Sequence, residues 1–215
     1  MIREYKHKSA PASLVAQIKY DGQDVLDQLF ADQHDKCYLC EMKIKQFYQV
    51  EHLKSQEHFE ELKFNWTNLL LSDGYCNGKK KENFDDILNP NQVNIEDVIE
   101  QRIDSINRTA LFVSSDTSIP TQQTIKLLNR IFNGTYSPKL RKKREEEFYK
   151  EVEQKFNAFN KIVLDYLTNP NLQTENAVRE ELAIDKELLG FKYWVIKDTP
   201  KLLAVFANDI IWNKQ

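Results

Sequence analysis

The residues best suited to chemistry lie in the first half of the chain. Two cysteines stand at Cys37 and Cys40, and a third follows at Cys76. A glutamate and a histidine are adjacent at Glu51 and His52. Thiolates bind zinc, carboxylates bind magnesium, and an imidazole can accept a proton near neutral pH. The sequence therefore offers groups for two kinds of metal ion and for acid–base catalysis.

The cysteine spacing predicts a structural zinc site. The segment CYLC has the two-residue separation that lets two thiolates bind one tetrahedral zinc ion. Asp73 stands three positions before Cys76, where a second such pair would have its first cysteine, and aspartate is a permitted ligand. His34 is a competing fourth ligand. In the alternative interpretation the cysteines are small buried hydrophobic residues and bind no metal. The predicted zinc ligands are Cys37, Cys40, Asp73 and Cys76.

The segment between the last two cysteines contains a candidate hydrolytic site. A strand ending at Glu51-His52 and a short helix beginning near Asn77 would bring a carboxylate and an amide oxygen to one divalent cation. Magnesium keeps several waters, so two protein oxygens suffice. The neutral imidazole would take a proton from water while the metal polarises a phosphoryl oxygen. Alternatively the histidine is an ordinary surface residue or a hydrogen-bonded residue of the core.

Composition narrows the classes of protein that fit. The 215 residues include only 5 glycines and 6 prolines, which favours a helix-rich globular protein. An odd number of cysteines is a poor disulfide framework. No apolar run approaches the roughly 20 residues of a membrane span, and the first ten residues lack the apolar core of a secretory signal. We therefore expect a cytoplasmic protein without membrane contact.

Nucleic acid would have to be met by local basic clusters, because the formal net charge is -3. One cluster, Lys79 to Lys81, lies at the end of the predicted short helix, and the other, which begins at Arg141, lies at the start of a longer helix. Cations in the first turn of a helix oppose its macrodipole, which favours phosphate contact as their purpose. The alternative is a solvated face, since three glutamates follow the second cluster. The predicted phosphate contacts are Lys79, Lys80, Lys81, Arg141 and Lys142.

Hydrophobic periodicity predicts an α+β fold that is mostly helical. Residues 98–115 fit either a helix or a hairpin, and we favour the hairpin. The C-terminal segment would serve as scaffold or as a partner-docking surface around Trp194, Phe206 and Trp212, unless these residues form core. Residues 13–35 are predicted to form one or two helices, with a possible break at Asp21-Gly22. The other predicted helices are 138–168 and 175–189, one ending at Asn133-Gly134 and one after Thr199-Pro200, and the predicted strand is 69–72. The predicted segments are a helical 1–35, a polar, cysteine-containing centre at 36–90 and a helical 91–215.

These motifs resemble the HNH, or ββα-metal, nucleases. The family pattern of C-x-x-C, then Asp/Glu-His, a middle Asn and a closing C-x-x-C-[His/Asn]-x-x-Lys is matched by CYLC, EH, N and DGYCNGKK. More closely, PASL, CYLCE, EHLKS, LKFNWTNLLLS, CNGKK and TIKLLN are similar to the PtuB-type proteins of Septu and retron anti-phage systems. The similarity covers most of the first 145 residues. It implies that residues 36–90 form an HNH nuclease core, a ββα-metal finger with a zinc knuckle that is embedded in a helical domain.

The resemblance implies a role for each matching residue. His52 falls on the general base, and Glu51 and Asn77 fall on the ligands of the catalytic cation, which is Mg or Mn. Asn68 falls on the asparagine that orients the histidine loop, and Lys80 on a basic residue facing phosphate. Asp73 departs from the pattern by replacing a cysteine, and Glu51 stands where many relatives have aspartate.

Two functions remain open. The first is a metal-dependent HNH endonuclease, the effector of an anti-phage system, which acts on DNA or tRNA-like RNA. Its implied partners are a PtuA-type ATPase and, in a retron, a reverse transcriptase with its noncoding RNA. The second is a non-catalytic zinc-finger adaptor that binds nucleic acid or a protein. We favour the nuclease, because an adaptor has no use for Glu51, His52 and Asn77 together.

Overall fold

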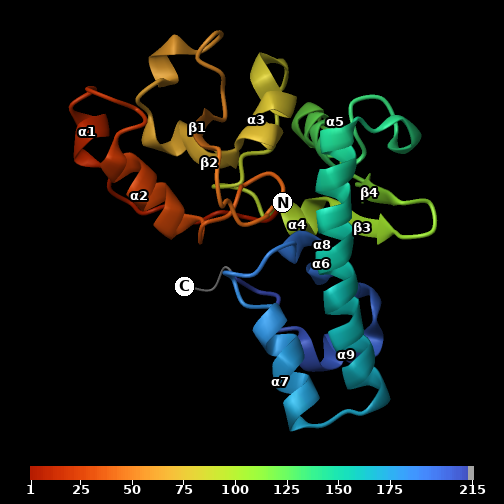
Figure 1. The fold of residues 1–215 in the computed structure, drawn as a ribbon. Helices are drawn as coiled ribbons and strands as arrows, with labels where there is room; N and C mark the ends of the chain where they lie inside the picture. Colours follow the sequence, from red (N-terminus) through yellow and green to blue (C-terminus); the bar gives the residue numbers. More distant parts are fainter. Residues whose placement is uncertain (213–215) are drawn as a thin grey trace.

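The computed structural model describes residues 1–212 and has a mainly helical α+β fold (Figure 1). Its strands form two small antiparallel sheets, β1 with β2 and β3 with β4. No helix in the described part is both long and apolar enough to cross a membrane. The strands are β1 (Tyr48–His52), β2 (Leu69–Asp73), β3 (Glu100–Asp104) and β4 (Thr109–Val113). The helices are α1 (Ala12–Val15), α2 (Gln23–Asp32), α3 (Gly74–Lys80), α4 (Ile95–Val98), α5 (Ile119–Phe132), α6 (Lys143–Thr168), α7 (Leu172–Glu181), α8 (Leu189–Asp198) and α9 (Pro200–Phe206).

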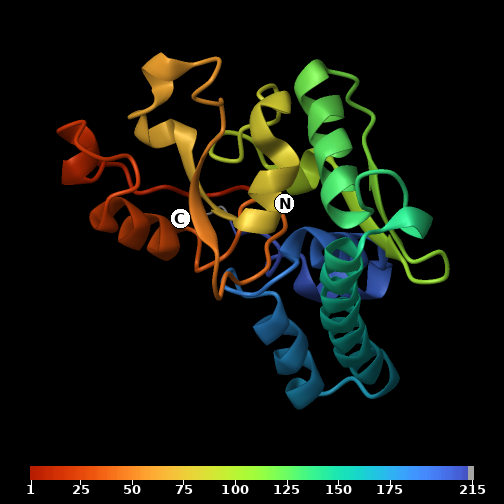
Figure 2. The same ribbon diagram turned by 45° about the horizontal axis from the view of Figure 1, so that its top comes forward.

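The first sheet and α3 give the strand–strand–helix order that the sequence predicts. In the register of the sheet, Glu51 lies opposite Leu70 and His52 opposite Leu69. The β2 residues 69–72 are all buried, because α2 packs on this strand and α3 follows it directly. In Figure 2, β1 and β2 lie between α2 and α3. The sheet therefore places the end of β1 beside α3.

The second sheet confirms the hairpin that we favoured for residues 98–115. The β4 burial pattern alternates, and α5 packs against this strand. The carboxylate of Asp104 accepts hydrogen bonds from the backbone N–H groups of Ile106 and Asn107, each at 3.0 Å, and so closes the turn. The hydrogen bonds of the turn and the alternating burial of β4 favour a hairpin over a helix in this segment.

The long helix α6 begins five residues later than predicted. Ser137 makes no capping hydrogen bond, and Pro138–Leu140 form only a short 3-10 turn. A carboxylate oxygen of Glu145 instead accepts a hydrogen bond from the backbone N–H of Lys142 at 2.8 Å. This interaction fixes the first turn, because it satisfies a donor that has no partner within the helix.

The prediction of one helix over 175–189 that ends at Gly190 was wrong. Two helices, α7 and α8, replace it, and Gly190 lies inside α8. A Cβ atom at Gly190 would lie only 2.6 Å from the side chain of Gln101. The backbone N–H of Gly190 also donates to Glu41 at 2.9 Å. The glycine therefore leaves room for the buried Gln101 amide against α8 and does not mark a helix end.

The aromatic residues that were considered for partner docking belong to the core instead. Phe206 is fully buried, and Trp194 is 9% exposed, with its indole N–H directed at the carbonyl of Glu96 at 3.0 Å. The indole N–H of Trp212 donates to the carbonyl of Leu182 at 2.7 Å. All three pack in the cluster formed by the last helices. A larger cluster combines residues from all three predicted segments, from Met1 to Phe191.

The buried carboxyl group of Glu96 gives a prediction about pH. Burial raises its pKa to about 7, so between its ordinary value near 4.3 and this value the folded state binds more protons than the unfolded state. The stabilising contribution is therefore complete below about pH 4 and is lost as the pH rises through 7. We expect Glu96→Gln, which still accepts from the backbone N–H of Arg3, to remove up to about 3 kcal/mol of this pH dependence. Urea unfolding of both proteins between pH 5 and 8 measures it, and parallel curves would contradict the assignment.

Candidate active site and metal centre

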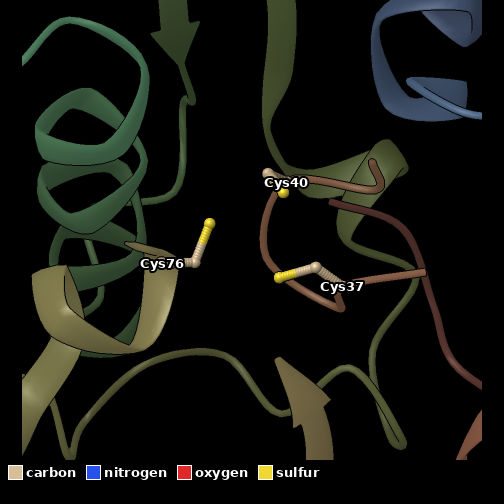
Figure 3. Close-up of side chains that lie close together, drawn as sticks. All are labelled: Cys37, Cys40 and Cys76. Atoms are coloured by element: carbon tan, nitrogen blue, oxygen red, sulfur yellow. The ribbon is translucent and has the colours of Figure 1, made fainter. Parts of the chain in front are cut away.

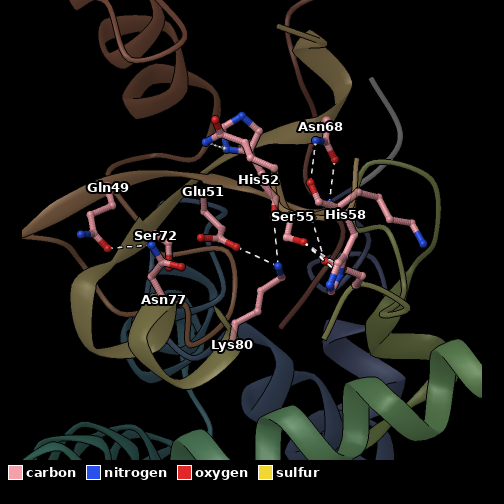
Figure 4. A network of polar contacts seen from close by, with 12 residues as sticks. Gln49, Glu51, His52, Ser55, His58, Asn68, Ser72, Asn77 and Lys80 are labelled. Carbon is pink, nitrogen blue, oxygen red and sulfur yellow. Dashed lines mark hydrogen bonds and ion pairs between the residues drawn. The ribbon is translucent and has the colours of Figure 1, made fainter. Parts of the chain in front are cut away.

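The end of β1 borders a hollow of about 450 Å³ that Glu51, His52 and Asn77 all line. Neighbouring residues of a strand point to opposite faces. Figure 4 accordingly shows the His52 ring on one side of β1 and the Glu51 carboxylate on the other, toward α3. Among residues 1–212, β1 pairs only with β2, so no described strand pairs with its other edge. A hollow at this edge can reach side chains from both faces of the strand.

The imidazole of His52 is buried and held in one orientation. Its Nε2 lies 3.0 Å from the carbonyl oxygen of Lys63, which can only accept a hydrogen bond, so Nε2 carries the proton. Nδ1 then keeps its lone pair and accepts from the side-chain amide of Gln56 at 3.2 Å. The edge of the ring meets the Tyr20 ring at a centroid distance of 4.8 Å. Burial lowers the pKa of His52, although the Lys63 carbonyl opposes this shift, so the side chain is neutral near pH 7.

The carboxylate of Glu51 is paired with a buried ammonium group. Lys80 Nζ lies 2.8 Å from Glu51 Oε1 and also donates to the carbonyl of His52 at 3.0 Å (Figure 4). The Lys80 side chain is 0% exposed and that of Glu51 is 8% exposed. Burial raises the pKa of Glu51, and the ion pair with Lys80 opposes this rise. The carboxylate is thus held beside the end of β1 by a cation that belongs to the protein.

Loss of the Lys80 ammonium is expected to destabilise the fold. Lys80→Met keeps the length of the side chain but leaves the Glu51 charge buried without a partner. Breaking a buried pair from one side costs about 3–5 kcal/mol. Chemical denaturation should show this loss, whereas Lys81→Met, at an exposed neighbour, should change the free energy of unfolding by less than about 0.5 kcal/mol. Equal stability of the two variants would mean that the pair contributes nothing.

Asn68 closes the loop that follows β1. Its side-chain oxygen accepts from the backbone N–H of Lys54 at 2.8 Å, and its side-chain nitrogen donates to the carbonyl of Lys54 at 3.0 Å. The backbone carbonyl of Asn68 also accepts from the backbone N–H of Leu53 at 2.8 Å. The closed loop carries both groups that bind the His52 ring, Gln56 and the Lys63 carbonyl. Asn68 is therefore a positioning residue for the histidine.

The same loop is tied to the segment after α3 by contacts that sequence reasoning missed. Asp85 accepts from the backbone N–H of Ser55 at 2.7 Å and lies 2.6 Å from Nδ1 of His58. The hydrogen bond to Asp85 raises the pKa of His58. The S-x-x-H spacing of Ser55 and His58 gave a signal for a local contact, but no pattern indicated the partner at Asp85. Backbone acceptors such as the Lys63 carbonyl leave no signal in side-chain identity.

Asn77 faces the hollow from the middle of α3. Its side-chain nitrogen donates to Gln49 Oε1 at 2.7 Å. Within residues 1–212, no hydrogen bond engages its side-chain oxygen, which stays available as an acceptor. The helix begins directly after β2 because the Asp73 carboxylate accepts from the backbone N–H of Tyr75 at 2.8 Å, an N-cap contact. This early start brings Asn77 alongside β1.

The three cysteines form a buried cluster behind the sheet (Figure 3). Their Sγ atoms all lie within 4.8 Å of one another. Ligands of a tetrahedral zinc ion at about 2.3 Å are separated by about 3.8 Å, so a small contraction would let all three sulfurs bind one ion. Burial raises the pKa of Cys40 and Cys76, whereas hydrogen bonds from these two thiols outweigh burial at Cys37 and lower its pKa. The cluster can therefore bind a metal such as zinc.

The predicted four-ligand set is not assembled. In the described part of the chain, the metal-ligand cluster consists of the three cysteines alone. The Asp73 carboxylate is engaged as the N-cap of α3. His34 lies outside the cluster in a left-handed turn with φ 52°. Asp73 has the sequence spacing of a zinc ligand, but its carboxylate accepts the N-cap hydrogen bond at the start of α3.

Most of the predicted phosphate contacts are engaged within the protein. Lys80 is buried against Glu51, and Lys79 contacts Glu145 and Thr135. The side chain of Arg141 is 2% exposed and lies over the Tyr149 ring, 3.7 Å from its centroid. These three positions do not fit direct phosphate contact, because their charged groups face inward. Lys81 and Lys142 are exposed and stay free to meet a phosphate.

No model of a known protein family matches the chain, and no curated protein shows significant similarity to it. The role of each residue therefore rests on geometry and on the motifs themselves.

Proposed function

We propose that the protein is a metal-dependent HNH-type endonuclease that hydrolyses phosphodiester bonds. The observation that carries the proposal is that three suitable groups line one hollow at the end of β1. These groups are a neutral imidazole, a carboxylate and an amide, which are contributed by His52, Glu51 and Asn77. General-base and metal-ligand groups are the parts that hydrolysis of a phosphodiester requires.

His52 is the general base in this proposal. Its Nε2–H is fixed on a backbone carbonyl, so the lone pair of Nδ1 is the site that removes a proton from water. That water takes the place of the Gln56 amide, which occupies Nδ1 here. Asn68 keeps the loop closed and the ring oriented. The lowered pKa of His52 keeps the base unprotonated at neutral pH.

Glu51 and Asn77 would hold a catalytic Mg or Mn ion. A carboxylate oxygen of Glu51 and the side-chain oxygen of Asn77 fit this role, since magnesium needs few protein ligands. A bound divalent cation supplies charge that polarises the phosphate and stabilises the leaving oxygen. The three cysteines would hold a structural zinc ion that connects the 37–40 loop to α3.

A non-catalytic adaptor is the competing function, and the Lys80–Glu51 pair favours it. This carboxylate already has a cation at 2.8 Å, so a second cation must bind beside a positive charge. An adaptor would use the same strand–strand–helix unit to bind nucleic acid or protein without cleavage.

The biological setting is proposed from motif resemblance. In this setting the protein acts in an anti-phage system of the Septu or retron type, with a PtuA-type ATPase as partner. In a retron, the reverse transcriptase and its noncoding RNA would join the complex. The substrate would be DNA or a tRNA-like RNA. Copurification with the products of neighbouring genes tests this setting separately from the chemistry.

Cleavage assays separate the two functions. The purified protein, alone and with the ATPase, is incubated with supercoiled plasmid and with total RNA in Mg²⁺, in Mn²⁺ or in EDTA. We expect strand cleavage in the presence of either ion and none in EDTA. Binding of nucleic acid without cleavage under every condition would establish the adaptor instead.

A further inference from the structure

A second hollow adjoins the candidate active site and has a volume of about 790 Å³. Tyr48 and Gln49 line both hollows, so the two hollows lie next to each other along β1. One wall of the second hollow carries Phe47 and Tyr48, and the opposite wall is the first turn of α6. A chain lying in this groove would pass directly from α6 to the end of β1.

The aromatic wall is presented to solvent by the backbone. Phe47 is 75% exposed and has a φ of 59°, a left-handed conformation that is strained for a bulky side chain. Its carbonyl accepts from the backbone N–H of Gly74 at 2.8 Å. A Cβ atom at Gly74 would approach that carbonyl to 3.1 Å, so the glycine makes this contact possible. Tyr48 is 48% exposed, and its ring packs edge-on against Phe30. Strain of this kind is concentrated at functional sites.

The opposite wall is mainly cationic. Lys143 is 92% exposed, and Arg144 lies beside it with its guanidinium 5.6 Å from the centroid of the Tyr75 ring. Glu147 is the one carboxylate among the residues that line the hollow, and it lies 4.0 Å from Lys143. Both cations stand in the first turn of a long helix, where the macrodipole is also positive. Cations at this end of a helix lower its stability, and they attract an anion.

We infer that the groove binds a single-stranded segment of the nucleic-acid substrate, next to the phosphate that is cleaved. Unpaired bases stack on Phe47 and Tyr48, and the phosphates between them meet Lys143 and Arg144. Stacking on exposed aromatic side chains requires a free base face, which a duplex does not offer along its length. The inference rests on the proposed nuclease function, because that function places the scissile phosphate in the first hollow.

Binding is tested with the full chain carrying His52→Ala, so that no cleavage intervenes. Fluorescence anisotropy compares a labelled 20-nucleotide single strand, as DNA and as RNA, with the duplex of the same sequence. We expect tighter binding of the single strand. Adding Phe47→Ala should weaken this binding at least about tenfold, and Phe47→Trp should preserve it. Ile106→Ala, at a residue that is 94% exposed on the β3–β4 turn, is the matched control and should have no effect.

The cationic wall is tested by salt dependence. Removing Lys143 and Arg144 together should lower the slope of log affinity against log salt by about 1.4, or about 0.7 for each phosphate contact on a single strand. Tighter binding of the duplex, or single-strand binding that Phe47→Ala leaves unchanged, would overturn the inference. These are binding measurements, so they can fail while the wild-type protein still cleaves. If the wild-type protein does not cleave while the His52→Ala protein still binds the single strand, the nuclease proposal fails instead.

Discussion

His52→Ala is expected to reduce the rate of phosphodiester cleavage by about 100- to 10,000-fold, the usual contribution of a general base. The variant removes the one nitrogen lone pair of the imidazole that the hollow offers to water. Glu51 and Asn77 stay in place, so substrate affinity should change little. Initial rates of plasmid nicking and of RNA cleavage under single-turnover conditions measure the effect.

The matched control for this experiment is His7→Ala. His7 is exposed, and in the described part of the chain its ring hydrogen-bonds only with the backbone of nearby Ser9. We expect this variant to cleave at the wild-type rate. Undiminished cleavage by His52→Ala would show that another group removes the proton, while cleavage lost in both variants would point to a contaminating nuclease or to damaged folding.

The second large effect is expected at the cysteine cluster. Wild-type protein should contain close to one zinc ion per chain, and Cys76→Ala should abolish this zinc. Loss of a structural metal is among the mechanisms that destabilise proteins by more than about 4 kcal/mol. Elemental analysis by mass spectrometry measures the zinc, and thermal and denaturant unfolding measure the stability.

Asp73→Asn is the control that separates the ligand from the helix cap. Asparagine caps a helix about as well as aspartate but has no negative charge to offer zinc. Since Asp73 already serves as the N-cap of α3, we expect this variant to retain both its zinc and its stability. Loss of zinc in Asp73→Asn would restore aspartate as the fourth ligand. Wild-type protein without metal would assign the cysteines to the hydrophobic core alone.

Much of the local structure follows from the sequence because it depends on nearest neighbours. The alternation in β4 predicts the hairpin, and the run of apolar residues before Asp73 predicts β2. Glu51, His52 and Asn77 all line one hollow because β1 pairs with β2 and α3 follows β2 directly, and their roles there stay a prediction.

The features that could not be predicted depend on distant partners. The sequence shows Lys80 as one of three lysines and does not reveal that its side chain turns inward to Glu51. Arg141 looks solvent-exposed within a basic run, but Tyr149 on the next turns of α6 covers its guanidinium. Gly190 resembles a helix stop until Gln101, far away in the chain, occupies the space of a side chain. Each error arises where tertiary packing decides which way a side chain points.

The Lys80 ammonium makes the two candidate metal positions different in kind. At the end of β1 the Lys80 ammonium already neutralises the charge of Glu51, so this region can fold correctly before a metal ion binds. The sulfur cluster consists of three thiols, which must give up protons to bind a metal ion. Assembly of the protein would then depend on the availability of one ion, while its activity would depend on the availability of another.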